Sequence, residues 1–516
     1  MQPFKKYIMK RTEIYKLLLC AFLVSAYSCT NLEIEQTDSN FENLTGEFTG
    51  VDPAASLDGL YNDWRGQIEN QGDLYALQEV SSDEQLVPTR GTDWGDNGVW
   101  RNLHDHNWDA NHSMVKATWN NLNQNVFRAT AIIDARSGGT AAQVAEAKFL
   151  RALATYHLVD MYGQAPFRTP DEGQEVNPSV KNRTEAFEFA VADLNEALPA
   201  LPAVGPGGGL NKATKASAQF LLARLHLNKH IYLATGSPAS ADMNKVVEMV
   251  DALSAAGFAL ESGYFNIFKE DSDNETIFFV GASTGNRIWN TLHYKQGAPG
   301  NEGGGWNGFT TLAEFYDLFE GNATTNVPGS GQEERRGFVP TNGDNGGIGY
   351  GFLIGQQYDE TGAPRTDRPG NPMIFTKELP GLLGNNENTG IRTIKYHPEN
   401  GSFTGHNVVF RYADAHLMKA EAIMNGASGG NALALVNELR ALRGASPMAA
   451  VTEQSMLDER GRELYIEGWR RSDQIRLGTW SQPWAYKSNA ETFRTVFPIP
   501  ATALISNPNL TQNEGY

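Results

Sequence analysis

The sequence predicts a mainly α-helical protein, in which a scaffold of tetratricopeptide-like helical hairpins carries long, loop-rich insertions. Several alanine-rich stretches place apolar residues at helical spacing, and short turns separate them. Two long stretches rich in glycine, asparagine, aspartate and tryptophan interrupt this pattern. No alternating pattern runs far enough for a sheet to form the scaffold. Because long loops inside a compact domain usually carry function, we expect the binding face on these insertions.

The clearest helix covers residues 141–162, where apolar side chains from Leu150 to Met161 form one stripe. Gly163 follows as a C-terminal cap, and Pro166 stops the helix. Other stretches with the same texture predict helices at residues 120–135, 213–232, 243–256, 412–424, 432–442 and 454–469.

The N-terminus has the pattern of an export signal. A basic segment precedes an apolar run from Leu17 to Tyr27, which at about eleven residues is too short to span a bilayer as a helix. Cys29 follows small residues directly after this run, as in a lipobox. We therefore expect a signal peptide at residues 1–28, a lipid on Cys29, and a lipidated tether at residues 29–45. An ordinary signal peptide or an uncleaved anchor is the alternative.

Charge restricts the class of ligand. The chain has a net charge of −18, and the mature protein lies near −22, because the signal peptide removes five positive charges and one negative charge. Such a surface repels nucleic acid and anionic lipid head groups. It also favours a neutral glycan over a uronate polymer. Cys29 is the one cysteine left after cleavage, so an intramolecular disulfide is excluded.

Residues 46–516 are expected to form a single body, because no linker or charge block divides them. Within it we expect the helical scaffold at residues 113–260 and 408–516, and loop-rich binding regions at residues 80–112 and 281–390.

The loop-rich regions have the composition of a glycan-binding face. A neutral glycan offers apolar C–H faces, on which aromatic rings stack, and hydroxyls, which charged side chains bind well. Burial beneath a loop is the alternative for each tryptophan, and those within helical patterns are expected in the core. The residues expected to contact glycan are Arg90, Asp93, Trp94, Trp100, Trp289, Tyr294 and Trp306.

Several segments together resemble, in order and over nearly the whole mature chain, the motifs of the SusD/RagB family of nutrient-uptake lipoproteins. They are Asp83-Glu84, Ala145 to Ala152 with Tyr162-Gly163, Trp306-Asn307-Gly308, Arg411 to Ala422, Asn437 to Arg443, Glu459 to Arg476, Phe497 to Pro500, and the ending Asn507 to Tyr516.

The resemblance implies a glycan-binding lipoprotein, anchored at the cell surface of the outer membrane, that delivers oligosaccharide or polysaccharide to a TonB-dependent, SusC-like transporter. It implies no catalytic residue and no cofactor. The glycan site would lie on one face, built from an early loop and the region around Trp306, and we include Asp83 in it. A neutral glucan is the favoured ligand.

Two other functions stay open. A glycoside hydrolase needs two carboxylates at a workable distance, which 60 acidic residues can always supply. A helical-repeat scaffold that binds only protein is the second. The charged residues between Arg440 and Asp473 have the spacing of an ion-paired seam between helices rather than of a catalytic cluster. His104, His106 and His112 lie close in sequence, but a loop of this kind is common without metal, so we expect no metal site.

Overall fold

The computed structural model describes residues 47–173, 175–269, 273–281, 285–297, 303–327, 329, 331–398 and 406–516. The predicted signal peptide, Cys29 and the predicted tether lie outside these residues. Residue contacts divide the chain after Glu47, and residues 48–516 form one unit. None of the helices in the described part of the chain is both long enough and apolar enough to cross a membrane.

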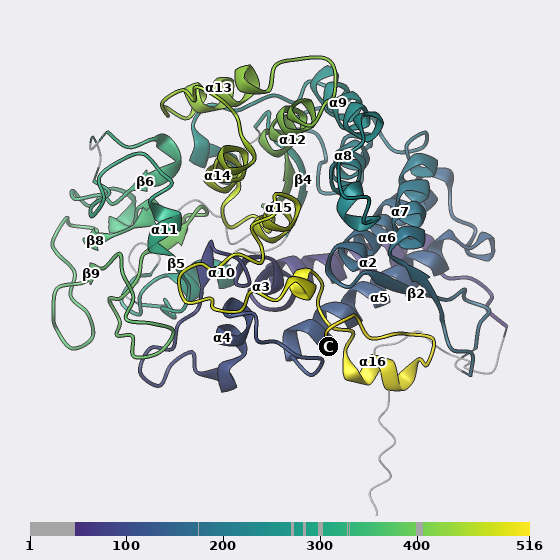
Figure 1. The fold of residues 1–516 in the computed structure, drawn as a ribbon, viewed down its shortest axis with the longest axis horizontal. Coiled ribbons are helices and arrows are strands. Elements are labelled where there is room, and N and C mark those ends of the chain that lie inside the picture. Colours follow the sequence, from purple (N-terminus) through teal and green to yellow (C-terminus); the bar gives the residue numbers. More distant parts are fainter. Residues whose placement is uncertain are drawn as a thin grey trace, which may run out of the picture. The chain divides into compact units, whose positions relative to one another are not determined.

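An array of antiparallel helices forms the scaffold (Figure 1). Each helix from α5 to α9 packs on the next one along the chain, and α12 packs on α9 to continue the array. This succession of helical hairpins confirms the mainly helical architecture that the sequence predicts. The helices are α5 (Ser113–Ile133), α6 (Ala141–Met161), α7 (Arg183–Ala197), α8 (Lys215–Tyr232), α9 (Ser240–Ala255) and α12 (Tyr412–Met424).

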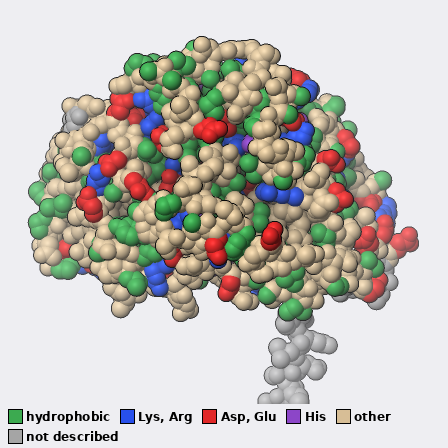
Figure 2. All heavy atoms as spheres, viewed as in Figure 1, with side chains coloured by type: hydrophobic (Ala, Val, Ile, Leu, Met, Phe, Trp, Pro, Cys, Tyr) green, Lys and Arg blue, Asp and Glu red, His purple; other side chains and the backbone are tan. Residues whose placement is uncertain are grey.

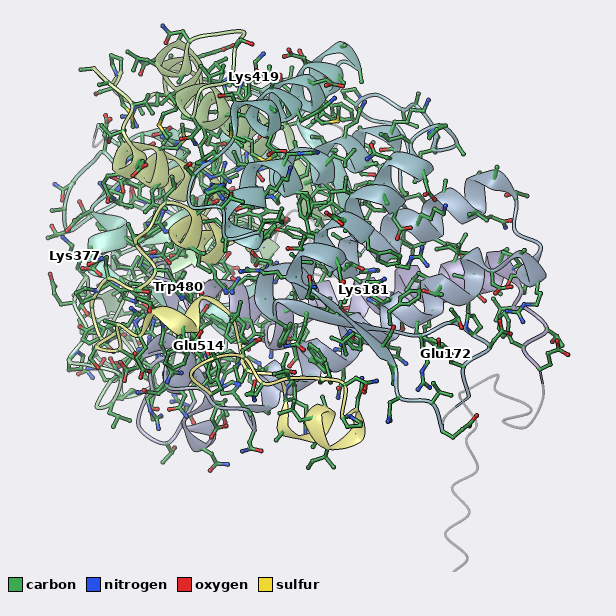
Figure 3. All side chains as sticks on the ribbon, turned by 45° about the vertical axis from the view of Figure 1, so that its right-hand side comes forward. Glu172, Lys181, Lys377, Lys419, Trp480 and Glu514 are labelled. Atoms are coloured by element: carbon green, nitrogen blue, oxygen red, sulfur yellow. The ribbon has the colours of Figure 1, made fainter. Side chains whose placement is uncertain are left out.

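Local sequence signals set the ends of α6. Thr140 and Gln143 form a capping box at its start, where each side chain bonds the backbone N–H of the other residue. Gly163 has a φ of 69° after its last turn, and its N–H donates to the carbonyl of Leu158 at 3.0 Å. The short strand β2 (Gln164–Phe167) then leaves the helix and pairs with β3 (Ser179–Asn182), which carries Lys181 (Figure 3).

The sequence prediction included neither α7 of the array nor two helices that precede the array. The two preceding helices are α2 (Pro53–Glu69) and α3 (Asp73–Glu79), and both pack on α5. At the end of α3, the buried carboxyl groups of Glu79 and Glu84 lie together and accept backbone N–H groups of Gly468 and Ile466. Burial raises the pKa of Glu79 to about 7, and burial together with the charge of Glu79 raises that of Glu84 well above its ordinary value. The two groups therefore share a proton near neutral pH.

The loop-rich part has short strands and a hydrophobic core of its own. That core gathers buried side chains such as Ile288, Phe352 and Ile391, and it lies beside the core of the helical array. Among the described residues no sheet here has more than three strands. The elements are β1 (Gln85–Leu86), α4 (Val99–His104), β4 (Thr276–Val280), α10 (Gly285–Thr291), β5 (Thr310–Thr311), α11 (Ala313–Tyr316), β6 (Gly337–Phe338), β7 (Tyr350–Leu353), β8 (Gly355–Gln356), β9 (Ile374–Phe375), β10 (Arg392–Ile394) and β11 (Asn407–Arg411).

The C-terminal helices contain the predicted ion-paired seam, which is confirmed. Glu463 on α14 (Glu453–Leu464) lies among the guanidinium groups of Arg335, Arg411 and Arg443, at 2.8 to 3.2 Å. These partners outweigh burial and hold its pKa well below the usual range. The predicted helix over residues 454–469 is too long: α14 ends at Leu464, because Tyr465 leaves the helical region (φ −53°, ψ 143°) and Ile466 follows with a φ of 53°. The remaining helices are α13 (Ala432–Leu442), α15 (Arg470–Arg476) and α16 (Ala501–Ser506).

Most tryptophans expected in the core are there. Trp480, on the segment after α15 (Figure 3), is 1 % exposed, and its Nε1 donates to the carbonyl of Arg494 at 3.0 Å. Trp484 is half-buried. The other buried ones are Trp64, Trp119 and Trp469, and Trp108 is buried as well.

Candidate glycan-binding site

A short β-ladder joins the two loop-rich regions. β1 pairs antiparallel with β5, and the chain beyond β1 then makes a tight turn. In this turn Arg90 and Asp93 exchange backbone hydrogen bonds of 3.0 and 2.9 Å. The ladder therefore brings Trp94 against Trp306, although 212 positions separate them in the sequence.

The indole of Trp94 lies against the backbone at Gly308. Its Nε1 donates a 2.7 Å hydrogen bond to the carbonyl of Trp306, and its ring meets that of Phe309 edge-on, 5.9 Å between centroids. A Cβ atom at position 308 would overlap the indole, so glycine is needed there. Trp94 has a φ of 59°, which costs a residue with a side chain about 1–3 kcal/mol. Such strained positions are common where a protein fixes a binding group.

Trp306 is the most exposed aromatic side chain of the site, with 63 % of its surface open to solvent. The backbone N–H of Trp306 donates a hydrogen bond to the carbonyl of Trp289 at 2.5 Å. The next residue, Asn307, is fully buried and has a φ of 55°. Its Oδ1 accepts hydrogen bonds from Nε and Nη2 of Arg392 at 3.0 and 2.6 Å, and its Nδ2 donates to the carbonyl of Glu387 at 3.0 Å. The backbone of Trp306 is thus fixed on both sides.

A group of polar side chains lies next to these tryptophans. The hydroxyl of Tyr294 donates to Asp93, and the guanidinium of Arg368 lies over the Tyr294 ring, 3.7 Å from its centroid. Burial and the hydrogen bond to Asp93 raise the pKa of Tyr294, so it stays protonated. Glu387 binds Arg368 and lies 3.2 Å from His293 Nε2. Burial and the charges of neighbouring arginines lower the pKa of His293 to about 3, so its ring is neutral.

This geometry suits a ligand that has an apolar face and a rim of hydroxyls. The Trp306 ring is open for stacking. The charged side chains of Asp93 and Glu387 come from segments that contact the Trp306 backbone or its neighbour Asn307, and Arg368 binds Glu387. Four of the residues that the sequence predicts as glycan contacts come together here: Asp93, Trp94, Tyr294 and Trp306.

Two other predicted contacts serve the fold instead. Asp83 accepts a bidentate pair of hydrogen bonds from Arg470 on α15, at 2.6 and 2.8 Å. Arg90 is 3 % exposed, and its Nη1 donates to the carbonyls of Asn386 and Thr389 at 2.8 Å. Burial lowers the pKa of Arg90 to about 10, which still leaves it charged at neutral pH. We therefore leave Asp83 and Arg90 out of the candidate contact set.

Two of the predicted tryptophans pack beneath the site and do not form its exposed surface. Trp100 is 5 % exposed; its Nε1 donates to Asp96 at 2.9 Å, and its ring meets Phe309 edge-on at 5.5 Å. Trp289 is half-buried against the second core. Trp100 thus packs beneath Trp94, and Trp289 holds the backbone of Trp306.

The third segment of the site lies within the predicted binding region at residues 281–390, but the sequence analysis did not single out its residues. Arg368 and Glu387 come from the loops around β9, which have no aromatic or motif-like pattern. No pattern in the sequence singles out Arg392 either, although its side chain holds Asn307 in place. Asn307 itself lies within the Trp306-Asn307-Gly308 motif, and that motif was the one available hint.

The three clustered histidines do not converge on a common point. The Nε2 atom of each ring lies within hydrogen-bonding distance of a different backbone carbonyl, and burial lowers the pKa of all three. In the described part of the chain no group of three or more His, Cys, Asp or Glu residues could hold a metal ion. The pairs are His104 with Ala485, His106 with Ser81, and His112 with Val99.

Acidic and basic side chains are interspersed over the face in view in Figure 2, without a continuous basic patch. This face therefore lacks the arrangement that a polyanion such as nucleic acid requires.

Comparison with known proteins agrees with the fold. The family model described as "SusD family" matches residues 274–516. The starch-binding protein SusD of Bacteroides thetaiotaomicron is 26 % identical, and the match covers 98 % of this chain and 100 % of that protein. The crystal structure of a SusD-like protein from Bacteroides fragilis is 18 % identical, with a TM-score of 0.70 over 91 % of this chain and 98 % of the other. Surface glycan-binding protein A from Bacteroides thetaiotaomicron, solved with laminarihexaose, is 18 % identical, with a TM-score of 0.63 over 89 % and 98 %.

Proposed function

Because residues 274–516 of this chain match the SusD family model, we propose that it is a non-catalytic, surface glycan-binding member of that family, and that it captures a neutral glucan on the face built around Trp306. The observation that carries the proposal is the side chain of Trp306 itself. It is a large aromatic ring, 63 % exposed, on a backbone fixed by buried hydrogen bonds. A soluble protein rarely leaves such a ring open beside fixed polar groups without a ligand for it.

Two observations support a neutral glucan in particular. Relatives that are named for a ligand include ones that bind starch, laminarin and laminarihexaose, all of which are uncharged. The net charge of the chain, −18, also disfavours a polyanionic glycan such as a uronate polymer.

Affinity gels test the proposal directly. The purified mature chain should be retarded in gels that contain soluble starch or laminarin, and not in plain gels. A parallel incubation should produce no new reducing ends, whereas a hydrolase would produce them. If no glucan retards the chain, the proposal fails.

We further propose that the protein is lipid-anchored through Cys29 and passes its glycan to a TonB-dependent, SusC-like transporter. The basic and apolar N-terminal segment ahead of Cys29 supports the anchor. A binding protein needs such a partner, because binding alone does not move a glycan across a membrane.

Detergent partition and co-purification test these two steps. Cys29→Ala should move the protein from the detergent phase to the aqueous phase, while Cys20→Ala, in the segment expected to be removed, should not. The wild-type protein should co-purify with a large β-barrel in mild detergent. Equal partition of the Cys29 variant and wild type would contradict the anchor, and isolation as a free monomer at native expression would contradict the transporter role.

A further inference from the structure

Arg368 comes from a turn that is built to hold it still. The turn connects β8 and β9, and it is closed by a bridge between Thr366 and Pro372. Asp367 fixes it further, because its Oδ1 accepts the N–H of Asn371 at 2.7 Å. The position of the Arg368 backbone is therefore set by short-range bonds within the turn.

Two groups then hold the side chain of Arg368, and one of them also binds its backbone N–H. Its guanidinium rests on the Tyr294 ring, its Nε donates to Glu387, and its backbone N–H donates to the same carboxylate at 3.0 Å. Partial desolvation lowers the pKa of Arg368, but the hydrogen bond to Glu387 outweighs it and leaves the pKa above its ordinary value. Glu387 is in turn bound through its carbonyl to Asn307, the neighbour of Trp306.

The hydrogen-bonding capacity of this arrangement is not used up. Nη2 of Arg368 lies 3.7 Å from Oδ2 of Asp93, which is too far for a hydrogen bond. Among the described residues the Nη groups of Arg368 make no hydrogen bond that meets the usual distance and angle. The side chains of Arg368 and Asp93 are 52 % and 43 % exposed. A donor fork and an acceptor thus stand side by side, both immobilised and both open to solvent.

We propose that Arg368 and Asp93 together recognise two hydroxyls on adjacent carbons of the sugar that stacks on Trp306. One hydroxyl donates to the Asp93 carboxylate, and its neighbour accepts from an Nη group of Arg368. Each bond is charge-assisted and therefore stronger than a bond between neutral groups. This inference rests on the proposed glycan-binding function, and it names the feature of the glycan that the site selects.

The linkage of the glucan decides whether such a pair of hydroxyls is present. A 1,4-linked glucan such as starch keeps the hydroxyls on carbons two and three free in every unit. In a 1,3-linked glucan such as laminarin, the oxygen on carbon three is in the linkage, so an interior unit has no two free ring hydroxyls on adjacent carbons. The site should therefore prefer 1,4-linked over 1,3-linked chains.

Calorimetry with two hexasaccharides of equal length tests this preference. Wild-type protein should bind maltohexaose, in which every unit carries such a pair, about tenfold more tightly than laminarihexaose, in which only the end units do, since a hydrogen bond to a charged group commonly contributes that much. Arg368→Met keeps an apolar stem over Tyr294 but removes the fork. It should lose about tenfold in affinity for maltohexaose and less than about threefold for laminarihexaose, so the preference disappears.

Two further variants separate recognition from folding. Arg368→Lys keeps the charge without the fork, and it should restore only part of the preference. Arg65→Met makes the same change on an exposed part of α2 and should leave both affinities at the wild-type value. The melting temperature of Arg368→Met should stay within about 2 °C of wild type, because the side chain is half exposed.

The outcomes distinguish this inference from the function on which it rests. If wild type binds both hexasaccharides equally, or if Arg368→Met keeps the preference, then Arg368 and Asp93 do not recognise adjacent hydroxyls. The proposed glycan-binding function is not affected by that result. If wild type binds neither these two nor any other glucan, the proposed function itself fails.

Discussion

Replacing Trp306 with alanine separates a binding role from a packing role more cleanly than any other change at the site. The described hydrogen bonds of Trp306 run through its backbone N–H and carbonyl, so alanine retains them. The ring is 63 % exposed, and surface substitutions of this kind usually change the free energy of unfolding by about 0.5 kcal/mol or less. The melting temperature should therefore move by no more than about 2 °C.

The effect on binding should be much larger. Truncating an aromatic side chain that stacks on a ligand commonly costs about 2 kcal/mol or more, which is over tenfold in affinity. Trp100→Ala provides the matched comparison, because this ring is 5 % exposed and its loss should cost about 3–5 kcal/mol of stability. Thermal melts and calorimetry with a soluble glucan on the same preparations measure both quantities. If Trp306→Ala binds within about twofold of wild type, or melts as early as Trp100→Ala, the assignment of this ring to the binding face is refuted.

Three more changes test the surrounding structure. Gly308→Ala should weaken glucan binding by about tenfold in calorimetry, because a Cβ there displaces the indole next to Trp306, and unchanged binding would contradict that close packing. Asp83→Ala should lower the free energy of unfolding, measured in urea, by about 3 kcal/mol, because it leaves the buried guanidinium of Arg470 without its carboxylate partner. The same change should leave the affinity for glucan unchanged, and a loss of affinity would show that Asp83 belongs to the site. Glu79 has a pKa of about 7 in the folded state against 4.5 as the ordinary value, so the folded state holds the extra proton and the free energy of unfolding should fall as the pH rises from about 4.5 through 7. Glu79→Gln should flatten this slope and raise the melting temperature at pH 8 relative to wild type, and a slope that stays the same would show that the proton is held elsewhere.

Local sequence was sufficient for most of the long scaffold helices, though not for α7 at residues 183–197, and for the resemblance to the SusD family. The helices at residues 412–424 and 432–442 begin and end where the periodicity of the sequence placed them. The motif resemblance is confirmed by the match to the SusD family model over residues 274–516 and by the full-length match to the starch-binding relative. Helix periodicity and capping depend on residues within one or two turns, which the sequence displays directly.

The same reasoning failed where distant residues determine the backbone. The helix expected to reach Trp469 ends at Leu464, because the next turn is shaped by the carboxyl groups of Glu79 and Glu84, nearly 400 positions earlier. The short helix α3, which supplies Glu79, was itself not predicted, because only seven residues form it.

By itself, the sequence determined that two tryptophan-rich regions carry the candidate site, that the protein is acidic, and that its scaffold is helical. Only the tertiary structure decided which tryptophan faces a ligand. Trp100 and Trp306 lie in regions of similar composition, yet Phe309 and Trp94 cover the first, and the second stays open. Arg368 joins the site through contacts with Tyr294, Asp93 and Glu387 from other loops. The physical reason is that side-chain exposure depends on which distant segments pack over a residue, whereas composition and periodicity are properties of the local chain.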